Sequence, residues 1–209
     1  MAKEGLPFII TGLCLTLVLV WLGLVVPYIL AGLLSLFIIF FFRDPNRNGH
    51  DRDNAAVFTP ADGTILSVQE FPDNENPLEE PAVKVSIFMS VFNVHVNRIP
   101  IGGTIKKIAY HPGKFFSANL DKASEHNENN RVRIDTGDSR CIVVIQIAGL
   151  IARRIACWVE ENEHVKTGQR FGLIRFGSRL EVYLPLDSRI TVKPHQKVKA
   201  GLTVVGYLP

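Results

Sequence analysis

The sequence contains few cysteines and no regular spacing of metal ligands. Its three cysteines, Cys14, Cys141 and Cys157, lie in apolar or strand-like runs, and no CxxC pair occurs. A disulfide framework or a cysteine zinc site is therefore not expected, and we predict that Cys141 and Cys157 pack as small hydrophobes. The six histidines are scattered without the HxxxH or HExxH spacing of metal-binding helices, so no metal site is predicted.

Charged side chains are absent from residues 6–42. One helix crosses the hydrocarbon core of a bilayer in about 20 residues, so this run is too long for a single crossing. Gly23 and Pro27 lie near its middle, and proline kinks or breaks a helix. We predict two apolar helices, 7–24 and 27–42, which form a membrane-associated hairpin over residues 1–42.

Basic residues flank the apolar run, with Lys3 before it and Arg43, Arg47 and Arg52 after it. Positive charge favours the cytoplasmic side of a membrane, which predicts a cell-membrane protein with its polar part on the cytoplasmic face. A signal peptide is the alternative, but its apolar segment would be shorter and would end at a small-residue cleavage site. The sequence leaves open whether the hairpin spans the bilayer or only dips into it.

Residues 43–209 form the second predicted domain and carry the net charge of +3. They contain no basic helix and no RNA-binding signature, so we expect anionic lipid headgroups rather than nucleic acid as partners. Short Val- and Ile-rich segments alternate with Gly, Pro and Asn, a pattern typical of a β-sandwich or barrel. The expected fold class is mainly β (α+β): a sandwich- or barrel-like domain after an apolar helical hairpin.

Gly177 and Ser178 join two strand-like segments, "FGLIRF" and "RLEVYLP". Together with Asp62 and His95, Ser178 suggests a Ser/His/Asp hydrolase, but the G-x-S-x-G elbow is absent. Alternatively, the Ser178 hydroxyl attacks the carbonyl of Gly177 with the help of a base, so that an ester replaces the amide. Gly177 suits this step because it tolerates a strained backbone. Removal of the Ser178 α-proton would then break the ester and leave a pyruvoyl ketone.

Four segments, considered together, resemble the short bacterial form of the phosphatidylserine decarboxylase proenzymes. They are "TPADG" at 59–63, "FMSVFNVHVNRIP" at 88–100, "HPGKFFSANLDKASEHNENNR" at 111–131 and "GQRFGLIRFGSRLEVYLP" at 168–185. Each motif is weak alone, but their order and the Gly-Ser pair near the C-terminus are specific. The resemblance covers nearly all of residues 43–209.

This resemblance implies a proenzyme that cleaves itself between Gly177 and Ser178. The products would be a β chain, 1–177, and an α chain, 178–209, which form a heterodimer, alone or within a further homo-oligomer. Ser178 would become a pyruvoyl prosthetic group. Its ketone would combine with the amine of phosphatidylserine and take up the electrons left when CO₂ departs, so that phosphatidylethanolamine forms.

The resemblance also assigns roles to individual residues. Asp62 matches the aspartate of the self-cleavage relay, and His95 matches a histidine of the decarboxylation step. Longer relatives have a second histidine three residues later, where this sequence has Arg98, and arginine cannot act as a base near neutral pH. Either His95 serves both steps or another histidine such as His111 supplies the base, and Arg98 would then hold the serine carboxylate or the phosphate of the lipid.

Residues 110–130 are rich in Gly, Pro and Asn and are expected to form either a surface loop or a lid that faces the substrate. Within them, Phe115 and Phe116 are candidates for shallow insertion into the membrane or for ordinary packing. Two other functions remain open from the residues: a membrane-anchored lipoyl-like β adaptor, in which Gly177-Ser178 is a plain turn, and a membrane-bound serine hydrolase with Ser178 as its nucleophile.

Overall fold

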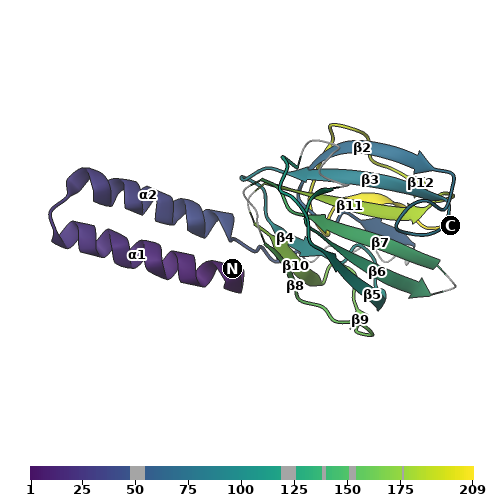
Figure 1. The fold of residues 1–209 in the computed structure, drawn as a ribbon, viewed down its shortest axis with the longest axis horizontal. Coiled ribbons are helices and arrows are strands. Elements are labelled where there is room, and N and C mark those ends of the chain that lie inside the picture. Colours follow the sequence, from purple (N-terminus) through teal and green to yellow (C-terminus); the bar gives the residue numbers. More distant parts are fainter. Residues whose placement is uncertain (48–54, 119–125, 138–139, 151–153, 176) are drawn as a thin grey trace. The chain divides into compact units, whose positions relative to one another are not determined.

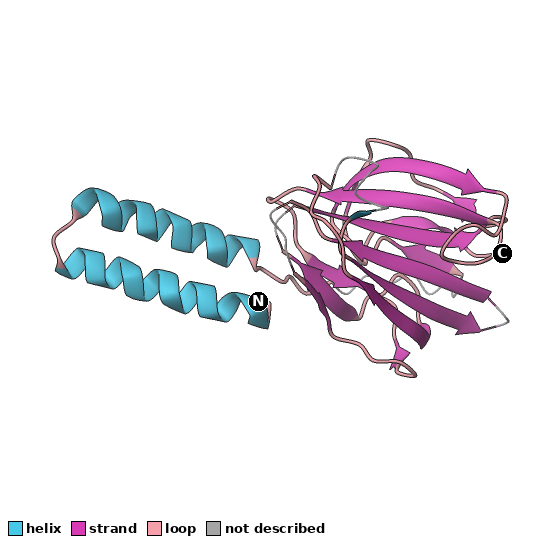
Figure 2. Ribbon diagram, viewed as in Figure 1, coloured by secondary structure: helices cyan, strands magenta, loops and turns pink. Residues whose placement is uncertain are grey.

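The computed structural model describes residues 1–47, 55–118, 126–137, 140–150, 154–175 and 177–209 (Figure 1). The chain divides into two compact units, Met1–Asn46 and Arg47–Pro209. The first is helical and the second is built of strands (Figure 2).

The helical unit contains a short 3₁₀ helix, η1 (Lys3–Gly5), followed by α1 (Leu6–Trp21) and α2 (Val25–Phe41). The two predicted apolar helices are confirmed, but the break between them lies at residues 22–24. Gly23 makes this turn with φ +70°, a conformation open to glycine. Pro27 lies inside the first turn of α2, where a missing N–H costs nothing, so it does not end a helix there.

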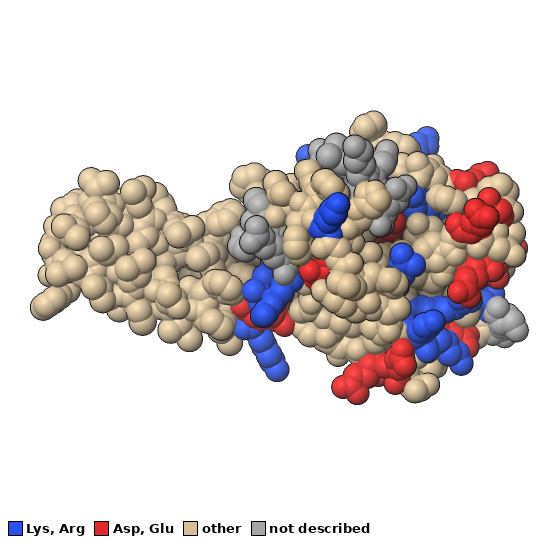
Figure 3. Space-filling view, viewed as in Figure 1, with Lys and Arg blue, Asp and Glu red and all other residues tan. Residues whose placement is uncertain are grey.

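Close packing joins α1 to α2. A side chain at Gly12 would place its Cβ 2.6 Å from the Ser35 hydroxyl, which is buried and donates a hydrogen bond to the Ala31 carbonyl at 2.8 Å. Figure 3 shows no charged side chain along the visible face of these helices. Among the described residues, one helix, Lys3–Trp21, is long and apolar enough to cross a membrane by length and composition, while Val25–Phe41 is shorter.

The described residues of the second unit form three antiparallel sheets. The largest has the order β13-β2-β3-β11-β7-β6-β5-β9, and the two smaller ones are β4-β10-β8 and β1-β14-β12. The strands are β1 (Ala56–Phe58), β2 (Gly63–Phe71), β3 (Ala82–Met89), β4 (Val96–Arg98), β5 (Gly103–His111), β6 (Asn129–Gly137), β7 (Arg140–Ile147), β8 (Ile155–Cys157), β9 (His164–Val165), β10 (Arg170–Ile174), β11 (Ser178–Pro185), β12 (Arg189–Ile190), β13 (Lys197–Val198) and β14 (Val204–Tyr207). The predicted mainly-β fold with N-terminal helices is confirmed.

Strand β11 lies at the centre of the large sheet and is covered on both faces. Leu180, Val182 and Leu184 point into the main core between the sheets, because side chains alternate along a strand. Arg179, Glu181 and Tyr183 lie on the opposite face, where Tyr183 belongs to a second apolar cluster with the fully buried Leu78 of the loop 72–81. This burial makes β11 a rigid support for the residue at which it begins.

Candidate active site

Ser178 is the first residue of β11, and it pairs with Met89 at the end of β3. Its side chain is fully buried, and its Oγ atom has no hydrogen-bond partner among the described residues. Burying a hydroxyl without a partner costs about 1–3 kcal/mol, so such a group needs an explanation beyond packing. The preceding residue, Gly177, has φ +63°, which glycine adopts without penalty. The predicted Gly-Ser junction is thus a constrained turn that carries a buried, available hydroxyl.

His95 immediately precedes β4 and is fully buried. Its Nδ1 atom lies 3.0 Å from the Asn93 carbonyl oxygen. Since a carbonyl can only accept, the neutral ring carries its proton on Nδ1 and presents a lone pair at Nε2. His95 is therefore held in the tautomer that a general base requires at Nε2.

Asp62 lies just before β2 and is bound by an arginine that precedes it in the chain. Arg47 donates two hydrogen bonds to the carboxylate, at 2.5 Å to Oδ1 and 2.9 Å to Oδ2, and the Ala200 N–H donates to Oδ1 at 2.8 Å. Both side chains of the ion pair are nearly buried. The sequence indicates Arg47 only as a basic residue beside the apolar run, so its bidentate contact with Asp62 is a part of the site that sequence reasoning misses.

Strand pairing brings these residues to one end of the large sheet. Ser178 pairs with Met89, and the neighbouring residue Phe88 pairs with Thr64, which places the start of β2 beside the end of β3. Asp62 precedes β2 and Ser178 begins β11, and β3 lies between these two strands, so the two backbones are separated by roughly twice the 4.8 Å strand spacing, or about 10 Å. A direct contact is not expected at this separation, and a group between the two would be needed to link them.

The segment that carries His95 is fixed beside both strands. The Arg98 N–H donates to the Pro60 carbonyl at 2.8 Å, two residues before Asp62. The Asn97 amide lies 3.7 Å from the Met89 sulfur, on the residue opposite Ser178. The fold therefore brings the segments that carry Asp62, His95 and Ser178 to one region.

A buried amide network supports the segment from the other side. Gln146 on β7 donates to the Asn97 side-chain carbonyl at 2.9 Å, and Asn130 on β6 donates to Gln146 at 3.0 Å. All three side chains are nearly or fully buried. Their only signal in the sequence is a polar residue within an apolar strand, so this support was not predicted.

Comparisons with known proteins identify the family of the chain. Residues 34–206 match the family model described as phosphatidylserine decarboxylase. The chain belongs to the phosphatidylserine decarboxylase family. Among curated proteins named phosphatidylserine decarboxylase proenzyme, that of Syntrophus aciditrophicus is 50% identical over 98% of this chain and 96% of the relative. Those of Desulfotalea psychrophila and Geobacter metallireducens are each 45% identical, over 99% and 100% of this chain and 96% of each relative.

Arg98 is the residue that the resemblance places where longer relatives have a second histidine. Its side chain is 5% exposed, and Nη1 donates to the Gly168 carbonyl at 3.0 Å. The guanidinium thus helps to fix the turn between β9 and β10. Because Arg98 is buried and this hydrogen bond is to the protein backbone, the contact supports a structural role for Arg98 in addition to the expected binding of lipid.

His111, at the end of β5, lies away from Ser178. It lines a cavity of about 530 Å³ together with Lys107, Arg131, Arg133 and residues of the loop 72–81. Val143, which also lines this cavity, belongs to the cluster on the second face of the sheet, whereas Ser178 lies on the face of Leu180 and the main core. This placement does not support His111 as the base for self-cleavage.

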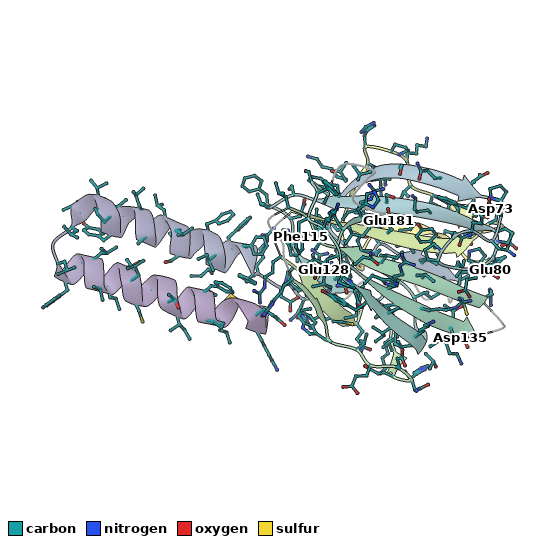
Figure 4. All side chains as sticks on the ribbon, viewed as in Figure 1. Asp73, Glu80, Phe115, Glu128, Asp135 and Glu181 are labelled. Atoms are coloured by element: carbon teal, nitrogen blue, oxygen red, sulfur yellow. The ribbon has the colours of Figure 1, made fainter. Side chains whose placement is uncertain are left out.

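The two phenylalanines of the expected lid differ in their surroundings. Phe115 is partly buried and packs against the main core. This contact is ordinary packing, the alternative to membrane insertion. Phe116 is 36% exposed and contacts the His126 ring, with 6.2 Å between ring centroids. In Figure 4, Phe115 and Glu128 lie at one end of the strand unit, opposite Asp73 and Glu80 of the loop 72–81. Residues 119–125 of the expected lid lie outside the described part of the chain.

A second cavity, of about 540 Å³, lies beside the segment that leads to Gly177, which we call the cleavage segment after the predicted cut. Its lining includes Arg154, Arg175, Tyr110 and Glu128. Arg175 precedes Gly177 by two residues, and the Glu128 carbonyl accepts a hydrogen bond from Ala148 at 2.9 Å. Among the described residues, no group of three or more His, Cys, Asp or Glu side chains is arranged to hold a metal ion.

Proposed function

We propose that this protein cleaves itself between Gly177 and Ser178 and then decarboxylates phosphatidylserine to phosphatidylethanolamine. The observation that carries this function is the buried Ser178 hydroxyl, which has no partner among the described residues and follows a glycine at φ +63°. A serine that only completed a turn would be expected to make a hydrogen bond or to reach solvent. The same buried position fits a pyruvoyl group at residue 178, because the side chain then ends in a methyl group, which needs no hydrogen-bond partner.

The chain's own residues can carry out the cleavage. The Ser178 Oγ attacks the Gly177 carbonyl carbon, the C–N bond breaks, and the hydroxyl proton passes through a base to the new amine, which gives an ester. We assign His95 as that base, since its Nε2 presents a lone pair. Removal of the Ser178 α-proton then expels the Gly177 carboxylate. The residue left at 178 loses its nitrogen as ammonia on hydrolysis and becomes the pyruvoyl group.

Once formed, the pyruvoyl ketone would supply the electron sink for loss of CO₂. Asp62, held by Arg47, would orient the residues around His95. Arg154 and Arg175 line the cavity beside the cleavage segment and would bind the phosphodiester of the lipid, because guanidinium groups match phosphate oxygens.

The fold can retain both products of the cut. Residues 178–209 contribute β11 to the centre of the large sheet, between β3 and β7, and β14 to a second sheet, where it pairs with β1. These pairings join the proposed α chain to the β chain at many points. We therefore infer a stable heterodimer of residues 1–177 and 178–209.

The helical hairpin suits a lipid substrate. Transfer of acyl chains into water costs about 0.8 kcal/mol per CH₂, so an enzyme tethered at the membrane needs to lift only the headgroup. Lys3 and Arg43 flank the apolar helices, which favours a cytoplasmic location for the strand unit.

A denaturing gel with intact-mass measurement tests this function. The purified chain should give two fragments, with the smaller one blocked at its N-terminus by a ketone, and Ser178→Ala should remain uncut. Carboxyl-labelled phosphatidylserine should release labelled CO₂, and hydroxylamine, which traps carbonyl groups, should stop the release. One intact chain with an unmodified Ser178 would contradict the function, and a serine hydrolase would also leave the chain whole.

A further inference from the structure

The carbonyl group of Gly177 lies directly against Gly149, which follows the end of β7. A Cβ atom built on Gly149 would be 1.8 Å from the Gly177 oxygen and 3.0 Å from the Gly177 carbon. Real Cβ atoms do not approach a backbone atom this closely, so the contact exists only because residue 149 has no side chain. The oxygen is nearer than the carbon, so the C=O bond points toward Gly149.

The two glycines meet different requirements. A Cβ atom on Gly177 would have nothing within 4 Å, so lack of space does not require glycine there. Its φ of +63° does require glycine, because other residues rarely adopt this angle. At Gly149 the demand is for space. The place that a Cβ atom of residue 149 would take is filled by the Gly177 carbonyl oxygen, and this is the carbonyl group that Ser178 attacks in the proposed cleavage.

The segment around Gly149 is fixed from two sides and cannot easily withdraw. The Asn127 side-chain amide donates to the Ala148 carbonyl at 2.7 Å and to the Phe116 carbonyl at 2.8 Å, while the Ala148 N–H donates to Glu128 at 2.9 Å. Ala118 closes the remaining side, since its Cβ would lie 3.3 Å from a Cβ at position 149. A side chain at position 149 would therefore displace the Gly177 carbonyl rather than the segment itself.

We propose that Gly149 is a positioning residue for self-cleavage: its bare backbone seats the Gly177 carbonyl oxygen and so turns the carbonyl carbon toward the Ser178 hydroxyl. This role depends on the proposed cleavage of the Gly177–Ser178 bond. A displacement of about 1 Å at a reacting group can cost roughly a hundredfold in rate. Even a methyl group at position 149 should therefore slow the reaction strongly.

Gly149→Ala in the full-length chain tests this role, with Gly103→Ala as the matched control. A Cβ at Gly103 would also strike a backbone oxygen, that of Asp135 at 2.2 Å, but at the start of β5, where the contact does not involve Gly177. For each variant, the rate of appearance of the two fragments is measured on a denaturing gel, together with the thermal unfolding midpoint. Gly149→Ala should cut at least about tenfold more slowly than Gly103→Ala after allowance for any difference in midpoint.

Hydroxylamine, which also cleaves esters, shows which step is slowed. Uncut Gly149→Ala protein should yield no more fragments in hydroxylamine than Ser178→Ala, because the ester does not form. Cleavage of Gly149→Ala at the rate of the wild type or of Gly103→Ala would overturn the role, as would a build-up of hydroxylamine-sensitive ester. If the wild-type chain itself is never cut, the proposed function fails and the role of Gly149 fails with it. If the wild type is cut but Gly149→Ala is cut equally fast, only the role of Gly149 fails.

Discussion

Arg47 and Asp62 form a bidentate ion pair at the end of the large sheet where Ser178 begins β11, with hydrogen bonds of 2.5 and 2.9 Å. The Arg47 guanidinium also donates to the Ala200 carbonyl at 2.7 Å. The pair therefore joins the residue that follows the helical unit to the start of β2 and to residue 200 near the C-terminus. The resemblance predicts Asp62 as a member of the self-cleavage relay but gives no sign of this arginine partner.

Replacement of Arg47 by methionine should destabilise the strand unit by about 3–5 kcal/mol, because it leaves a nearly buried carboxylate without its cation. The double variant Arg47→Met with Asp62→Asn should recover part of this loss. Chemical unfolding of the detergent-solubilised chain measures both. Arg189→Met, which removes an exposed arginine stacked on Tyr207, is the control. Equal losses for Arg47→Met and Arg189→Met would show that the ion pair has no special weight.

Tyr183 should give the protein a pH-dependent stability on the alkaline side. Burial, and after it the charge of Glu181, raise the pKa of the Tyr183 hydroxyl well above its ordinary value of 10.0. Its stabilising contribution is therefore complete below pH 10.0 and is lost as the pH rises toward the folded-state pKa, since the unfolded chain ionises first. Tyr183→Phe should make the alkaline fall in unfolding free energy shallower.

The control for Tyr183→Phe is Tyr207→Phe, which removes a hydroxyl from another sheet of the same unit. Unfolding free energies are compared just below and well above pH 10.0, the ordinary tyrosine pKa. Parallel pH curves for Tyr183→Phe and the wild type would refute the assignment. So would an equal change of slope in both variants.

Much of the fold could be predicted because its signals are local. The uncharged run 6–42 and the alternating Val- and Ile-rich segments indicate helices and strands without knowledge of their partners. The exact helix boundaries could not be predicted, since Gly23 made the turn and Pro27 was tolerated inside α2. From the sequence alone, a proline that lies before a helix cannot be distinguished from one that lies in the first turn of the helix.

The site was predictable only at the Gly177-Ser178 junction and at the residues matched by resemblance. Arg47 contacts Asp62, and Gly149 meets Gly177, because strand register and chain reversals bring distant segments together. No local spacing records such a contact. His111 is the opposite case. Its place in a polar loop of the sequence suggests a base for self-cleavage, but β5 places it on the sheet face away from Ser178.

Asn127 should be needed for self-cleavage, because it holds Ala148, and the next residue, Gly149, lies against the Gly177 carbonyl. Asn127→Asp keeps the oxygen that accepts from the Phe116 N–H but removes the donors to the Phe116 and Ala148 carbonyls. We expect slower self-cleavage and a stability loss of about 1–3 kcal/mol for each carbonyl left buried and unsatisfied. The rate of cleavage is read on a denaturing gel.

Asn76→Asp is the matched control for Asn127→Asp. Asn76 has the same pattern, since it accepts from the Leu78 N–H and donates to the Asp73 and Glu80 carbonyls. It lies in the loop 72–81, at the other end of the strand unit from Glu128, as the labelled Asp73 and Glu80 show in Figure 4. Asn76→Asp should lose stability but be cut at the wild-type rate, and equal slowing of the two variants would contradict a local effect of Asn127.

Arg154 and Arg175 should determine how tightly the lipid headgroup is bound. Each replacement by glutamine removes a cation from the cavity beside the cleavage segment, where Glu128 is the lining carboxylate. Each charged hydrogen bond lost is worth about 1.5–3 kcal/mol, so KM for phosphatidylserine in mixed micelles should rise roughly tenfold or more, with a smaller change in kcat. Arg133→Gln, which changes an arginine of the other cavity, should leave KM near the wild-type value. Because the proposed cleavage would precede lipid binding, all three variants should still be cut completely. A normal KM in both Arg154→Gln and Arg175→Gln would place the phosphodiester site elsewhere.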